Sequence, residues 1–137
     1  RRVKGEYIFG LEDVSASRKF DDAICRLSYY VDIHKGKRAG YKREEEQEKI
    51  TEPSPGGYYE IPYRSLLPLN IDNLLVAGRC VSSTQAGHAA IRIMPACMAM
   101  GQAAGAAAAL SVKNSVTPKQ IDVNQLLDVL RSQRALV

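Results

Sequence analysis

Residues 73–110 read NLLVAGRCVSSTQAGHAAIRIMPACMAMGQAAGAAAAL, and this stretch decides most of what the sequence predicts about the fold. Its apolar run at 74–77 predicts a short buried strand, which Gly78 and Arg79 end at once. From Pro95 onward most residues are small, which predicts a long and slim helix. A strand, a glycine turn and a slim helix are typical of segments that bring backbone close to a large flat ligand.

The start of this helix predicts a site for an electron-rich group. Pro95 suits the first helical position because it has no N–H group to leave unsatisfied. Met94 offers no side-chain acceptor, so the amides of Ala96, Cys97 and Met98 are predicted to be free for another partner. The helix dipole favours a phosphate or a carbonyl oxygen at this end, and water is the alternative.

Two glycines, Gly101 and Gly105, lie in the middle of the predicted helix. A glycine there costs roughly 1 kcal/mol relative to alanine, so the pair predicts close packing against a neighbouring helix or sheet. A purely structural alanine-rich helix is the alternative. Residues 89–110 have about the length of a membrane span, but they contain Arg92 and Pro95 and are mostly alanine, so no span is expected.

Two arginines and two histidines are the candidates for a direct role in chemistry. Arg79 can donate to a pyrophosphate or to ribityl hydroxyls. Arg92 sits in an otherwise uncharged run and needs a partner, which an internal carboxylate can also supply. His34 and His88 can act as acid or base or bind a substrate anion, with a surface histidine as the alternative. His34 and Arg92 are the candidate catalytic residues, and neither histidine has a metal-ligand spacing, so no metal site is predicted.

The composition is that of a soluble globular domain with one core. The 137 residues carry a net charge of +4, and acidic and basic residues are mixed within 35–49, so nucleic-acid binding is not expected. The three cysteines include no CxxC pair, which argues against a disulfide framework. A reducing compartment, the cytoplasm, is therefore expected.

Outside the central stretch, the patterns predict shorter elements. Strands are predicted at 1–9, 28–33 and 58–63, two short helical turns at 11–25, and a loop at 35–57. Because prolines interrupt the chain around the third strand, a central position in a sheet is not expected for it.

Near the C-terminus, two helix-start signals follow each other. Thr117, Pro118 and Gln120 form a capping box, and Asp122 repeats the signature. The apolar residues that follow at helical spacing predict one buried face, formed by Val123, Leu126, Leu127 and Leu130.

Several separated segments resemble one known family. They read RRVKGEYIFGLEDV at 1–14, FDDAI at 20–24, YVDIH at 30–34 and YEIPYRSL at 59–66, beside NLLVAGRC and RIMP in the central stretch. Together they resemble FAD-dependent oxidoreductases of the two-dinucleotide-binding-domain type. The resemblance implies FAD as the cofactor and hydride transfer to it from a small-molecule substrate, for which a carbohydrate or an organic acid is the expectation.

The resemblance also implies where the cofactor lies. Gly78 and Arg79 are expected near the ribityl and pyrophosphate portion of FAD. The helix start is expected to face the isoalloxazine ring, through Arg92, Met94, Pro95 and Ala96, with Cys97 next in the helix.

One departure from the family pattern is the missing GxGxxG motif, which in the family holds the other part of the FAD site. We therefore expect the C-terminal part of a larger flavoenzyme, an α/β or α+β fragment that contributes to a Rossmann-like FAD-binding domain. It is expected to comprise substrate-region elements at 1–69, an FAD-binding strand, turn and helix at 70–112, and a helical segment at 113–137. Alone the chain is expected to be inactive, with uncovered apolar surfaces that favour a homo-oligomer. A stand-alone interaction module and a non-redox nucleotide-binding protein are the alternatives.

Overall fold

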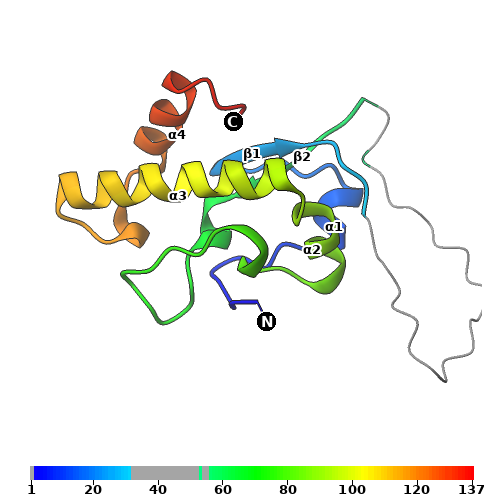
Figure 1. Cartoon of the computed structure of the whole chain (residues 1–137), viewed down its shortest axis with the longest axis horizontal. Coiled ribbons are helices and arrows are strands. Elements are labelled where there is room, and N and C mark those ends of the chain that lie inside the picture. Colours follow the sequence, from blue (N-terminus) through cyan, green and yellow to red (C-terminus); the bar gives the residue numbers. More distant parts are fainter. Residues whose placement is uncertain (1, 32–52, 54–55) are drawn as a thin grey trace, which may run out of the picture.

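The computed structural model describes residues 2–31, 53 and 56–137, and it combines helices with one small antiparallel sheet (Figure 1). The longest element, helix α3, packs against β1 of the sheet, and the C-terminal helix packs against α3. The α-helices and strands are α1 (Leu11–Ser15), β1 (Ala23–Leu27), β2 (Tyr59–Pro62), α2 (Gln85–Ile91), α3 (Met94–Asn114) and α4 (Val123–Ser132). The described residues also form three 3-10 turns: η1 (Tyr63–Leu66), η2 (Gly78–Cys80) and η3 (Pro118–Gln120). This mixture is compatible with the predicted α/β class.

The sheet consists of β1 and β2, paired antiparallel with Leu27 opposite Tyr59 and Arg26 opposite Glu60. Strand β2 confirms the strand predicted at 58–63, and it lies at an edge as expected. The strand predicted at 28–33 was wrong, because its described residues, 28–31, are irregular. Strand β1 lies just before them, where a helical turn was expected. Pairing across the sheet decides this, since Arg26 Nε lies 3.3 Å from the Glu60 carboxylate on the partner strand.

The segment at 74–77 does not form the buried strand that was predicted. It has no regular secondary structure and belongs to no sheet in the described part of the chain, and Leu74 is 43% exposed. Its backbone makes one hydrogen bond to another segment, from Val76 N–H to the Leu66 carbonyl oxygen at 2.9 Å. A strand needs a continuous row of such bonds to a neighbour, and the residues described here supply only this one. Residues 2–9 are similar, since they form only isolated bridges, at Gly5 and Phe9.

The C-terminal helix confirms the predicted signals. Asp122 caps α4 by accepting from the Asn124 amide at 2.9 Å, and the buried face holds Leu126, Leu127 and Leu130. The Thr117 capping box is present, but it begins the 3-10 turn η3 and not a separate α-helix.

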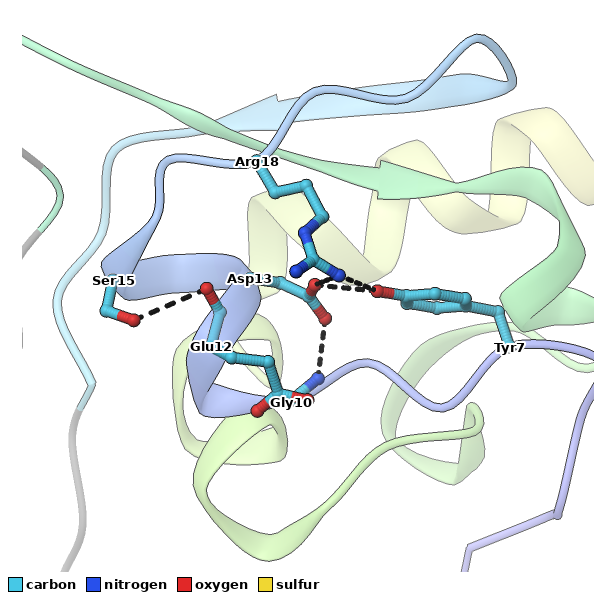
Figure 2. A network of polar contacts seen from close by, with 6 residues as sticks. All are labelled: Tyr7, Gly10, Glu12, Asp13, Ser15 and Arg18. Atoms are coloured by element: carbon cyan, nitrogen blue, oxygen red, sulfur yellow. Dashed lines mark hydrogen bonds and ion pairs between the residues drawn. The ribbon is translucent and has the colours of Figure 1, made fainter.

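A network around a buried carboxylate fixes α1 to the N-terminal segment (Figure 2). Asp13 is fully buried and accepts from the Tyr7 hydroxyl at 2.6 Å and from the Gly10 amide at 2.8 Å. The guanidinium of Arg18 lies 2.9 Å from the same carboxylate. A buried charge needs such partners, so the network is a structural anchor of the fold.

Candidate functional site

The predicted glycine turn is present and requires glycine. Gly78 has a φ of +78°, a backbone conformation that residues with a side chain rarely adopt. It begins η2, and a Cβ atom placed on it would lie 4.0 Å from the Cβ and Sγ atoms of Cys97. The turn therefore lies directly beside the first turns of α3.

Helix α2 was not predicted, although the sequence carries a signal for its start. The hydroxyl oxygen of Thr84 accepts from the Gly87 amide at 3.0 Å and so caps the helix. A Cβ atom on Gly87 would lie 2.4 Å from the Phe9 carbonyl oxygen, so glycine lets α2 approach the N-terminal segment closely. The threonine followed by small residues is the signal that could have revealed this helix.

Two hydrogen bonds in opposite directions join η2 to α2 and to the α2–α3 junction. The Nε2 atom of His88 lies 3.0 Å from the Arg79 carbonyl oxygen. The Nε–H group of Arg79 donates to the carbonyl oxygen of Arg92 at 3.2 Å. The thiol of Cys97 also points to that oxygen, at 3.7 Å. The structure thus brings together four residues that the sequence singled out, from η2, α2 and α3.

The environment of His88 favours its neutral form. Burial lowers the pKa of His88 below its ordinary value, and the positive charges of Arg2, Arg92 and Arg79 lower it further, while the hydrogen bond to the Arg79 carbonyl opposes this. A carbonyl oxygen only accepts, so Nε2 carries the proton and Nδ1 is left as an acceptor.

The start of α3 lacks a side-chain cap, as predicted. The helix begins at Met94, which is 72% exposed, and the N-cap residue Ile93 provides no side-chain hydrogen bond. Two of the three amides were predicted wrongly. The Cys97 amide donates to the Ile93 carbonyl oxygen at 3.1 Å, and Met98 lies beyond the first four positions of the helix, where amides bond within it. The helix starts one residue earlier than expected, which leaves the first-turn amides of Met94 and Ala96 without an intrahelical acceptor.

One face of α3 is open along its length. Met98 is 74% exposed and Val112 is 82% exposed. No atom lies within 4 Å of a Cβ placed on Gly101 or on Gly105, so the close packing expected for these glycines is not made by the described residues. By length and composition alone, α3 is also the one helix of the described chain that could cross a membrane. Of its most apolar stretch of 18 residues, 33% is buried inside the protein.

Segment 73–78 runs alongside α3. Asn73 shares a shallow surface hollow with Ser111 and Val112 near the end of α3, and Gly78 lies beside Cys97 near its start. Segment 73–78 therefore follows the helix in the opposite direction, as a strand does before the turn that leads to a packed helix.

Other predicted site residues have different outcomes. His34 and most of the loop at 35–57 lie outside the described residues. Arg92 is half-buried and flanks the α2–α3 junction. Within the described residues, no group of three His, Cys, Asp or Glu side chains is placed to hold a metal ion.

Comparison with known proteins gives one match. The family model described as FAD dependent oxidoreductase matches residues 1–130 of the chain. No curated protein and no solved structure matches it significantly.

Proposed function

The chain belongs to the FAD-dependent oxidoreductase family, whose cofactor is FAD, and we propose that it forms the C-terminal part of such an enzyme and completes its flavin site. In these enzymes the bound flavin supplies the redox chemistry by accepting a hydride from the substrate, and the protein positions it. The substrate is proposed to be a small molecule, either a carbohydrate or an organic acid.

The open face of α3 is the observation that carries the proposal. Gly101 and Gly105 each cost roughly 1 kcal/mol relative to alanine, and nothing in the described chain uses the space they leave. Met98 and Val112 are exposed on the same helix, although apolar side chains are stabilised by burial. A partner surface that packs on this face would use all four residues, and the dinucleotide-binding part of the flavoenzyme is the partner we propose.

The residues around the glycine turn fit a bound FAD. The backbone at Gly78 is unobstructed by a side chain. Among the described contacts Arg79 donates only through its Nε–H, so its two terminal nitrogens can serve a ligand. We place the ribityl and pyrophosphate portion near these two residues. The uncapped start of α3 offers amides to the electron-rich edge of the flavin ring, so the ring is placed near Arg92, Met94, Pro95, Ala96 and Cys97.

By this proposal the chain alone does not turn over substrate and binds FAD weakly or not at all, since the pyrophosphate-binding GxGxxG unit is not in its sequence. Its open apolar face also favours self-association in isolation. The test is the visible absorption spectrum of the complete enzyme, purified without added cofactor. Flavin bands that persist through purification support the proposal.

A colourless enzyme that does not take up added FAD would contradict it. The same open helix would then favour the alternative function, a protein-interaction module. Substrate oxidation by the isolated chain with added FAD would refute the claim that the chain is inactive alone.

A further inference from the structure

The turn η2 depends on other segments of the chain for its conformation. Gly78 has a φ of +78°, and glycine is the residue least restricted to one conformation. A turn of three residues leaves its last two carbonyl oxygens without partners inside the turn. In η2 the Cys80 oxygen accepts from the Val3 amide at 3.0 Å. The Arg79 oxygen lies 3.0 Å from Nε2 of His88, so the N-terminal segment and α2 both hold the turn.

Helix α2 carries the His88 ring on a firm support. The Tyr59 hydroxyl of β2 donates to the Ala90 carbonyl oxygen at 3.2 Å, and this hydrogen bond is buried. Gly87 lets the helix lie against the carbonyl oxygen of Phe9 in the N-terminal segment. His88 lies between these two contacts in the sequence, and its ring is half-buried. The donor that reaches η2 therefore comes from a helix that is packed on two sides.

The hold on the backbone of Arg79 is matched by a hold on its side chain. The Nε–H group of Arg79 donates to the Arg92 carbonyl oxygen at 3.2 Å, at the junction of α2 and α3. Both the backbone and the guanidinium of Arg79 are thus fixed by the same part of the fold. A side chain that is already oriented loses less conformational freedom when it binds a ligand.

We infer that His88 is a positioning residue for the cofactor. Its Nε2–H group holds the Arg79 carbonyl oxygen, and so keeps η2 and the Arg79 side chain in the conformation that receives FAD. The inference rests on the proposed function, which places part of FAD at this turn. His88 acts here through a hydrogen bond and not through charge, because Nε2 can donate from both the neutral and the charged ring.

Loss of this hydrogen bond should weaken cofactor binding even though no contact to FAD is removed. If only a fraction of the molecules has the binding conformation of the turn, the apparent Kd rises by the inverse of that fraction. A single hydrogen bond shifts such an equilibrium by roughly five- to tenfold. His88→Ala should therefore raise the Kd for FAD by about that factor.

The experiment is a titration with FAD of the complete enzyme, stripped of its flavin, followed by flavin fluorescence. It is carried out at pH 8, where the ring is neutral because burial lowers the pKa of His88 below 6.5. His88→Gln places an amide N–H group near the position of Nε2 and should keep the affinity of the wild type. His88→Asn is too short to reach the Arg79 oxygen from there and should bind FAD as weakly as His88→Ala.

A matched control is Gln125→Ala on α4. It also removes one exposed side-chain hydrogen bond, which Asn114 donates to Gln125 at 2.8 Å, and it should leave the Kd for FAD unchanged. Thermal unfolding of the stripped enzymes shows whether each variant is folded. The pair of His88→Gln and His88→Asn keeps the test decisive even where His88→Ala does not fold.

A Kd for FAD that is the same in His88→Asn and the wild type would overturn the inference. So would a loss of affinity in His88→Gln as large as that in His88→Asn, because the donor would then not matter. Either result in an enzyme that binds FAD leaves the proposed function intact. A wild-type enzyme that takes up no FAD contradicts the proposed function, and the inference falls with it.

Discussion

Replacing the two glycines of α3 by alanine should raise or lower the free energy of unfolding, depending on whether another surface covers the helix. Apart from neighbouring backbone of the helix itself, no atom of the described residues lies within 4 Å of a Cβ built on Gly101 or Gly105. Alanine there gains about 1 kcal/mol of helix propensity per site without any clash. The double variant Gly101→Ala/Gly105→Ala should therefore stabilise the isolated chain by about 2 kcal/mol, or roughly 8 °C in Tm for a chain of this size.

In the complete enzyme the same double variant should do the opposite. If the dinucleotide-binding part packs on this face, the added methyl groups separate the two surfaces, and overpacking costs about 1–3 kcal/mol. We expect reduced flavin content, measured as the ratio of flavin to protein absorbance after purification, and a lower Tm. Thermal unfolding followed by circular dichroism measures the isolated chain.

A matched control is Gly87→Ala, also in a helix. Its Cβ would lie 2.4 Å from the Phe9 carbonyl oxygen, so it should destabilise both the chain and the enzyme. A double variant that stabilises the complete enzyme and keeps its full flavin content would refute the reasoning, because the face would then be open to solvent in the enzyme as well.

Three further predictions concern the anchor, the turn and the core. Asp13→Ala removes a fully buried acceptor with three partners and should cost about 3 kcal/mol in urea unfolding, whereas Asp128→Ala, in an exposed pair, should cost under about 0.5 kcal/mol; equal costs would contradict the anchor. Gly78→Ala forces a side chain into positive φ and should lower stability by about 1–2 kcal/mol, with flavin loss in the complete enzyme; an unchanged Tm would show that the turn relaxes freely. Burial raises the pKa of Cys25 from its ordinary value of 9.0 to about 11, so the stability it provides is complete below pH 9.0 and is lost as the pH rises through about 11. Urea midpoints that stay flat across this range would exclude the effect.

The elements that the sequence predicted are those with strong local signals. Helix α3 has Pro95 in its first turn, and α4 has Asp122 as its cap and apolar residues at helical spacing. Gly78 is recognisable because a turn with positive φ selects glycine. Such features depend on residues close together in the chain, so one sequence is sufficient to read them.

The elements that were missed depend on distant partners. Strand β1 is defined by pairing with β2, including Arg26 with Glu60, and its own residues carry only weak alternation. Helix α2 consists mostly of small residues, so it lacks the apolar stripe that marks most helices. The segment at 74–77 has the composition of a strand, but a strand exists only where a neighbour supplies hydrogen bonds.

The same division applies to the candidate site. The sequence singled out Arg79, Arg92, Cys97 and His88 as separate residues, and the fold joins them through carbonyl oxygens. No side-chain pattern encodes a bond to a backbone carbonyl, so this junction was not predictable. Arg2 likewise lies beside η2 only because the fold brings two distant segments together.

The energetics of α3 favour a partner on its open apolar face. Burying an apolar side chain of the size of Met98 or Val112 gains about 1.5–3 kcal/mol. The two glycines together cost about 2 kcal/mol in the isolated helix. Docking on this face therefore gains more than the glycines cost, provided that the partner approaches closely enough to fill the space above Gly101 and Gly105. A backbone or a flat ring satisfies that condition better than a surface of long side chains, which is why we propose a sheet and its flavin as the partner of this helix.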